Sequence, residues 1–167
     1  MDLYVLGKQL LDLTVEQLTT LGTVVPDRQY MAPGSDVAFD CEQLTVRLTR
    51  VISNFQGADT PYPMVTHMKQ RKTAEYFVTL VRCVPTMHED GTPPSTSELN
   101  DASNITMNDA MNLRIALENI EHAHTLVQRN VPTTVGQLQT LGPLGGMVAN
   151  DMMFSVEIVS NPAGWVG

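Results

Sequence analysis

The histidines are the side chains of this sequence best suited to metal binding or proton transfer. There are four of them: His67, His88, His122 and His124. His122 and His124 are two residues apart in a predicted helix, so they point to different faces, whereas a helical metal pair needs a spacing of four. His88 precedes Glu89 and Asp90 in a turn-like segment, which is typical of a solvated turn. The histidine pattern therefore predicts no metal site.

The possible nucleophiles and the glycine-rich segment match no catalytic pattern. Ser155 lies in a strand-like run and lacks the Gly-x-Ser-x-Gly elbow of the hydrolases. A phosphate-binding loop needs a lysine after its glycines, but no lysine or arginine follows Arg129, so residues 142–146 are expected to form a hairpin tip. Glu118 and Glu121 share a helix face, which is ordinary for an exposed acidic face. The sequence predicts no enzyme and no cofactor.

The two cysteines, Cys41 and Cys83, fit neither a zinc site nor a disulfide scaffold. Each lies in a strand-like run, where a free cysteine packs as a small apolar residue. A cross-strand disulfide between them stays open at this point. The first residues lack a basic region before an apolar stretch, so we expect no secretory signal and synthesis in a cytoplasm.

Charged side chains are unevenly distributed along the chain. The bases gather in the region of two predicted strands and the loop between them: Arg47, Arg50, Lys69, Arg71, Lys72 and Arg82. The acids follow one predicted helix: Glu98, Asp101, Asp109, Glu118 and Glu121. A subunit with one basic and one acidic side can pair head-to-tail with its own copies and close into a ring. We therefore expect a subunit interface that uses Arg47, Arg50, Arg82, Glu118 and Glu121; accidental clustering on a solvated surface is the alternative.

Length and composition exclude several classes of protein. The 167 residues suit one domain, and 43% hydrophobic content is too high for a disordered chain. No apolar run is long enough to span a membrane. A net charge of −8 disfavours a protein that holds nucleic acid. Only 17% of the residues are charged and ten are methionine, which is consistent with a surface that a partner covers; a merely polar, uncharged surface is the alternative.

Hydrophobic periodicity and turn residues predict the elements that must position these side chains. Helices are expected over 2–21, on a stripe of leucines, and over 97–128, with a start at Ser95, Thr96 or Ser97 and Glu98 in the first turn. Residues 22–36 are expected to be a connector. Strands are expected over 37–51, 73–84 and 135–141 and around 152–158, and a long loop over 52–72. The run 73–84 is apolar on both faces, which predicts a central strand, and a bulge is expected near 40–43. The elements predict an α+β fold, a mainly antiparallel sheet of four or more strands packed against two helices, with residues 1–160 as one domain and 161–167 as a loose tail.

Three segments of the sequence resemble a family of phage proteins. They are Asp40-Cys41-Glu42-Gln43-Leu44-Thr45-Val46, the run from Tyr76 to Pro85, and Leu141-Gly142-Pro143-Leu144-Gly145-Gly146. In this order around a long acidic helix, they resemble the tail terminator proteins of long-tailed phages that infect actinobacteria. The resemblance extends from the first helix to about Val159, and its motifs are structural, not catalytic.

The resemblance implies a structural virion protein that is assembled in the host cytoplasm. Tail terminators form a homo-hexameric ring that caps the tail tube, meets the stopper or connector of the head, and lets DNA pass through its lumen without specific binding. An acidic chain suits this role because a like-charged lumen repels the DNA backbone. The long loop, with Tyr62, Lys69, Arg71 and Lys72, would be an arm toward a neighbouring ring or the tube. A head-completion protein (adaptor or stopper), another minor tail protein of the neck, and a small-ligand-binding or enzymatic domain are the alternatives.

Overall fold

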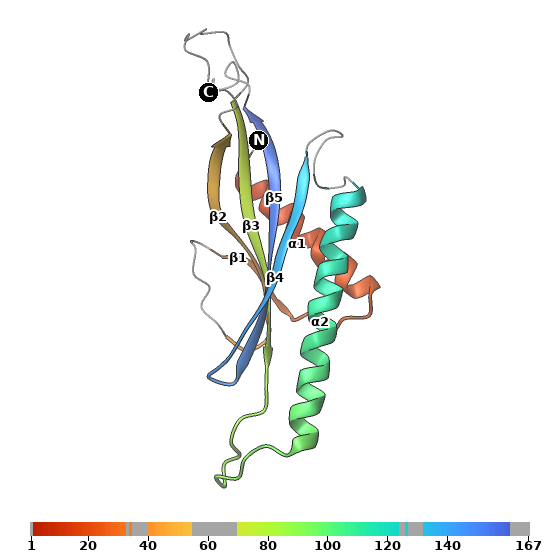
Figure 1. Ribbon diagram of the computed structural model, residues 1–167, viewed down its shortest axis with the longest axis vertical. Coiled ribbons are helices and arrows are strands. Elements are labelled where there is room, and N and C mark those ends of the chain that lie inside the picture. Colours follow the sequence, from red (N-terminus) through yellow and green to blue (C-terminus); the bar gives the residue numbers. More distant parts are fainter. Residues whose placement is uncertain are drawn as a thin grey trace.

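The computed structural model describes residues 2–32, 34, 40–54, 70–123, 126 and 132–160 (Figure 1). Within these ranges, two helices and five strands follow one another along the chain, and together they form the predicted α+β fold. Their bounds are α1 Leu3–Thr20, β1 Arg28–Ala32, β2 Gln43–Asn54, β3 Gln70–Cys83, α2 Thr96–Ala123, β4 Thr133–Leu144 and β5 Met147–Ser160.

The five strands form one sheet in the order β1-β2-β3-β5-β4. The edge strand β1 runs parallel to β2, with Tyr30 opposite Thr45, and every other pair is antiparallel. Strand β3 is therefore the central strand, as its apolar residues on both faces predict. The β2–β3 register shifts between Leu48 and Arg50, so the bulge lies farther along the strand than the sequence pattern indicates.

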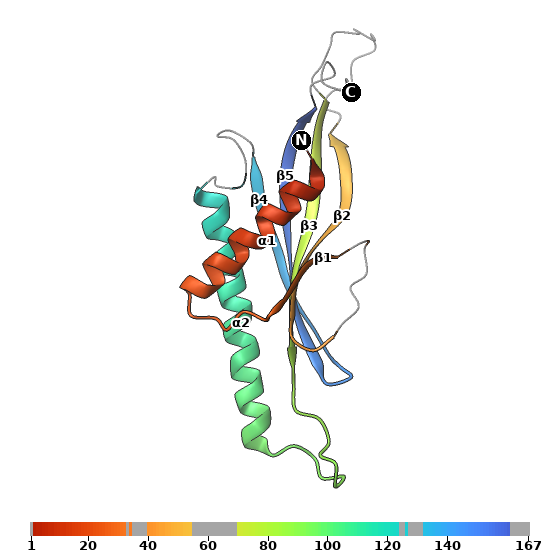
Figure 2. The same cartoon turned by 180° about the vertical axis from the view of Figure 1, so that it is seen from behind.

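Both helices pack on the same face of the sheet (Figures 1 and 2). Helix α1 crosses β1, β2 and β3, whereas α2 lies along β4 and β5. The core lies between the helices and the inward residues of the strands, for example Leu10, Leu117, Val78 and Phe154, which are all fully buried. The alternation of apolar and polar residues in β2 places Leu44 and Val46 toward the helices.

Each helix begins with a cap that the local sequence supplies. The Asp2 carboxylate accepts hydrogen bonds from the backbone N–H groups of Tyr4 and Val5, at 2.8 and 3.4 Å. Before α2, the Glu98 carboxylate accepts a hydrogen bond from the Ser95 N–H at 2.8 Å, and the Ser95 hydroxyl accepts one from the Glu98 N–H at 3.2 Å. This is a capping box, and it confirms the predicted helix start at residues 95–97.

Several elements differ from the sequence-based expectation. Strands β2 and β3 extend into the predicted 52–72 loop, and β4 and β5 are longer than predicted. Strand β1 lies in a segment that we predicted to be a connector, because five residues at a sheet edge are too short to show a hydrophobic period. Helix α2 ends at Ala123, five residues before the predicted end. The arm residues Tyr62 and Lys69 and the tail 161–167 lie outside the described residues.

Candidate interaction surfaces

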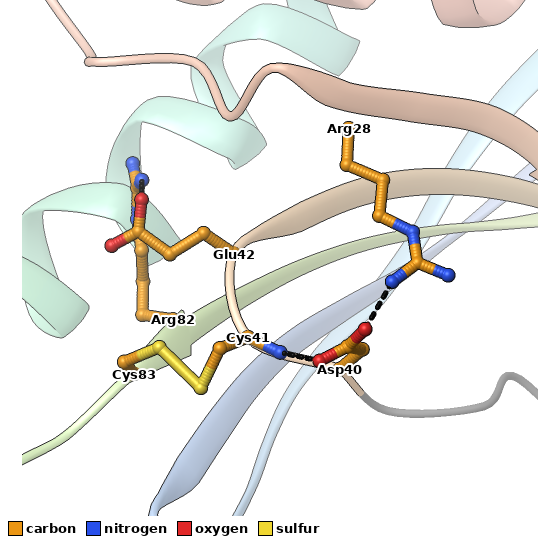
Figure 3. The surroundings of a disulfide bond; sticks show 6 residues. All are labelled: Arg28, Asp40, Cys41, Glu42, Arg82 and Cys83. Atoms are coloured by element: carbon orange, nitrogen blue, oxygen red, sulfur yellow. Dashed lines mark hydrogen bonds and ion pairs between the residues drawn. A yellow bond between two sulfur atoms is a disulfide. The ribbon is translucent and has the colours of Figure 1, made fainter.

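Arg82 forms a buried ionic cluster that joins β3, α2 and the segment after α1. Figure 3 shows the part of this cluster that Arg82 and Glu42 form. Its Nε donates a hydrogen bond to the Asp109 carboxylate at 2.6 Å, and one of its terminal nitrogens donates to the Val24 carbonyl oxygen at 2.5 Å. The Glu42 carboxylate lies 3.7 Å from the other terminal nitrogen. The side chains of Arg82 and Asp109 are 8% and 7% exposed, so this ion pair is largely withdrawn from water. Its role is to fix α2 to the sheet.

The disulfide bond between Cys41 and Cys83 lies next to this cluster (Figure 3). It joins the residues just before β2 to the end of β3, with 5.2 Å between the two Cα atoms. The Cys41 N–H donates to the Asp40 carboxylate at 2.8 Å, and Asp40 also pairs with Arg28 of β1. The cysteines are therefore paired, not free, which settles the alternative that the sequence left open. This end of the sheet is held by covalent and ionic contacts together.

Arg47 belongs to a second buried network, on the sheet face that points away from the helices. Its guanidinium donates to the Asp151 carboxylate at 2.8 Å and to the Thr79 hydroxyl at 3.3 Å. The Thr79 hydroxyl in turn donates to Asp151 at 2.5 Å, and the guanidinium carbon lies 5.0 Å from the centre of the Phe77 ring. The network ties together the three middle strands β2, β3 and β5.

The burial of Arg47 and Arg82 corrects their predicted role at a subunit interface. Both side chains pair with acids inside the subunit, and they present little charge to a neighbouring copy. Reversing either charge would first break an internal contact, so such variants cannot test an interface. The sequence could not show this, because the two acids that they bind, Asp151 and Asp109, are 104 and 27 residues away.

The other predicted interface residues are at least partly accessible to solvent. Arg50 is exposed and donates two hydrogen bonds to the Glu75 carboxylate, at 2.5 and 3.2 Å. The hydrogen bonding and the negative charge of Glu75 raise the pKa of Arg50. Glu118 accepts a hydrogen bond from Arg114 at 2.8 Å on the outer face of α2, and Glu121 is half-buried nearby. Lys72 is half-buried near the start of β3.

The charges of the described chain separate between its two ends along the long axis. One end holds the beginning of α2 and the 84–95 segment before it (Figure 1). From Cys83 to Leu113 the sequence contains no lysine or arginine, and its exposed acids are Glu89, Asp90, Glu98 and Asp101. At the opposite end, where β2 ends and β3 begins, Arg50 and Lys72 lie near two acids, Glu75, which pairs with Arg50, and Glu157. Arg71 precedes Lys72 in β3. We call these the acidic end and the basic end.

Hydrogen bonds keep two of the acids charged at the acidic end. The Ser95 hydroxyl and N–H bind the Glu98 carboxylate and lower its pKa. The Thr92 hydroxyl and N–H do the same for Asp90. Because donated hydrogen bonds favour the charged form, both groups stay ionised to a lower pH than ordinary carboxylates. The acidic end is therefore negative throughout the neutral range.

An apolar groove of about 810 Å³ runs along the first half of α2 at the acidic end. Its walls are α2 on one side and, on the other, the 84–86 segment after β3, the second half of β4 and the start of β5. Its apolar side chains include those of Leu99, Met107, Met111, Leu138, Pro143 and Val148. Leu99, Met107 and Met111 are exposed by 47%, 71% and 58%, and Pro143 is exposed as well. The sequence carried a signal for this groove, because the two methionines lie four residues apart and off the buried stripe of the helix.

Within the described ranges, no three histidine, cysteine, aspartate or glutamate side chains gather in a way that could hold a metal ion. No helix among these residues is long and apolar enough to cross a membrane. The exposed features that stand out are the two charged ends and the apolar groove, and all of them are suited to contacts with a macromolecule.

Comparison with known proteins adds no relative. No model of a known protein family matches this chain, and no curated protein matches it either.

Proposed function

We propose that this protein is a structural virion protein, a tail terminator whose copies form a ring at the head-proximal end of a phage tail tube. The observation that carries the proposal is the pairing of an acidic end with a basic end on one small α+β subunit. Opposite charges on two different surfaces favour head-to-tail contacts between identical copies. Heterologous contacts of this kind close into rings when the rotation between copies is a whole fraction of a turn.

Two further features support a role in a virus particle. The Cys41–Cys83 disulfide suits a protein that works outside the cell, because disulfides persist in oxidising surroundings, which include virion surfaces. The net charge of −8 suits a ring through which DNA moves, since acidic side chains repel phosphate and do not hold it. The resemblance of the Asp40–Val46, Tyr76–Pro85 and Leu141–Gly146 segments to tail terminators supplies the specific role.

The proposed partners follow from this role. They are other copies of the chain in a hexamer, the tail tube protein, and the stopper or connector protein of the head, with DNA passing through the lumen. The 52–72 loop, which leaves from the basic end, is the proposed arm toward the tube or a neighbouring ring. Deleting residues 55–68 should leave the circular dichroism spectrum unchanged and weaken the joining of tails; full joining by the deletion variant would exclude the arm.

Electron microscopy of the purified protein tests the proposal. Negative-stain images should show rings with six-fold symmetry, and the protein added to polymerising tail tubes should stop their growth at a defined length. Bovine serum albumin at the same concentration controls for crowding. Twelve-fold rings would indicate an adaptor in place of a terminator. A monomer at all concentrations, with no effect on tubes, would exclude the proposed function.

A further inference from the structure

The apolar groove at the acidic end exposes large apolar side chains to water. It combines an apolar wall of α2 with the β4–β5 hairpin, and Arg114 is the one charged side chain that lines it among the described residues. Two exposed methionines and an exposed leucine in a concave surface are typical of the centre of a protein interface, where methionine is enriched and charge is depleted. An occupant of this groove should be uncharged and should carry a large apolar side chain.

The last seven residues of the sequence have this chemistry. The segment Asn161-Pro-Ala-Gly-Trp-Val-Gly167 contains no charged residue, and Trp165 is the only tryptophan of the chain. Tryptophan is a frequent anchor at interfaces because it buries a large area with few rotatable bonds. The segment follows Ser160, where β5 ends at the basic end of the subunit.

The segment is too short to reach the groove of its own copy. The groove residue Leu138 is paired with Met152, which precedes Ser160 by eight residues of β5, or about 26 Å of strand. Val148 lies twelve residues before Ser160, or about 40 Å away along the strand. Trp165 comes five residues after Ser160, and a fully extended chain of that length spans at most about 18 Å.

A second copy brings the two surfaces together. The segment leaves from the basic end and the groove lies at the acidic end, so a head-to-tail contact that pairs opposite charges also brings the segment of one copy to the groove of the next. We infer that residues 161–167 of one copy dock, through Trp165, into the groove between α2 and the β4–β5 hairpin of a neighbouring copy. The inference rests on the self-association in the proposed function, and it names the contact that holds the copies together.

Two single variants of the full chain break the two halves of this contact. Met107→Asp places a charge in the groove, and Trp165→Ala removes the anchor. Each should raise the concentration needed for half-assembly by about tenfold or more, as loss of an interface anchor does, when measured by sedimentation velocity. Met87→Asp is the matched control for the groove, because Met87 is 69% exposed and does not line it. Asn161→Ala is the control for the segment.

Mixing the two variants tests whether the contact forms between copies. The Met107→Asp copy keeps an intact segment and the Trp165→Ala copy keeps an intact groove, so a mixture should form pairs although neither variant assembles alone. Only the Met107→Asp copy contains tryptophan. A blue shift of the tryptophan fluorescence emission on mixing therefore reports directly that Trp165 docks in an apolar site. Circular dichroism of each variant confirms that it is folded.

Each outcome bears on the inference. Reduced assembly of both variants, with pairs and a blue shift on mixing, supports it. If the unaltered chain assembles and the Trp165→Ala variant assembles equally well, the inference is overturned while the proposed function stands. If the variants lose assembly but mixing gives neither pairs nor a blue shift, the trans contact is overturned. If the unaltered chain stays monomeric, both proposals fail.

Discussion

At the scale of single residues, the charges of this protein divide into buried and exposed sets with different roles. Arg82 and Arg47 lie in the interior and neutralise Asp109 and Asp151, whereas Arg50 and Asp101 lie at the surface. A buried charge that loses its partner costs far more free energy than an exposed one, because water no longer compensates it. The buried pairs therefore govern stability, and the exposed charges are the ones available to the proposed association between copies.

Replacing Asp109 by alanine should strongly destabilise the fold. Arg82 would keep only the Val24 carbonyl and the more distant Glu42 carboxylate, and breaking a buried pair typically costs about 3–5 kcal/mol. Urea denaturation followed by circular dichroism measures the loss. Glu118→Ala is the control, since it breaks the exposed pair with Arg114 and should cost less than about 0.5 kcal/mol. Equal losses for the two variants would contradict the structural role of Arg82.

Tyr76 should make the stability of the fold fall at high pH. Its ring is buried in the core, its hydroxyl donates to the Leu3 carbonyl at 2.8 Å, and burial raises its pKa above the ordinary value of 10.0. A raised pKa in the folded state means that the contribution of Tyr76 is complete below about pH 10 and is lost as the pH rises toward the folded-state pKa. The free energy of unfolding, measured by urea denaturation from pH 8 to 11, should fall more steeply with pH for the natural chain than for Tyr76→Phe. The same dependence of the free energy of unfolding on pH for both proteins would contradict the prediction.

At the scale of elements, the molecule depends on ties between segments that are far apart in sequence. The parallel strand β1 is held at the sheet edge by its pairing with β2 and by the Arg28–Asp40 contact. Helix α2 adds no buried side chain before Thr106, so its first ten residues depend on the capping box and on what covers the groove. These weakly packed parts are the ones available for binding.

The disulfide should contribute measurably to stability, because it closes a long loop. Cys41 and Cys83 are 42 residues apart, and the chain-entropy model gives about 4 kcal/mol for a loop of that length, with 2–4 kcal/mol typical. The double variant Cys41→Ser, Cys83→Ser should lose this stability in urea denaturation. Dithiothreitol should lower the stability of the natural chain to the same level and leave the double variant unchanged. If dithiothreitol left the stability of the natural chain unchanged, the result would contradict the presence of the disulfide bond in solution.

At the scale of the whole molecule, the subunit is elongated and electrically polar along its long axis (Figure 1). The acidic end, the groove and the first half of α2 lie together, and the basic end lies where β5 finishes and β3 begins. Such an arrangement gives direction to self-association, since like ends repel and unlike ends attract.

Assembly should therefore depend on which end carries a charge change. Asp101→Lys at the acidic end should reduce assembly in low salt, and added Lys72→Glu copies should restore it in part, because the reversed charges then attract. Raising the salt concentration should weaken assembly of the natural chain, since charges are screened beyond about 10 Å at 0.1 M. Sedimentation velocity measures each case. Glu16→Lys makes the same charge change on α1, and an equal effect of this control would show that only net charge matters.

The local sequence was sufficient to predict the elements whose signals are periodic or chemical. The leucine stripe predicted α1, the doubly apolar run predicted the central place of β3, and Ser95 with Glu98 predicted the start of α2. The same reasoning missed β1 and extended α2 too far, because a short edge strand and a helix end have little hydrophobic period of their own. The α+β fold followed from the order of these elements.

The tertiary structure alone decided which charged residues face each other. Asp109 and Glu118 look alike in the helix sequence, yet one is buried against Arg82 and the other is on the outer face. The pairing of Cys41 with Cys83 and the position of Met107 in a groove also depend on the packing of distant segments. Hydrophobic periodicity fixes which face of an element is buried, but ion pairs and grooves depend on how elements meet, and that information is not local to any one of them.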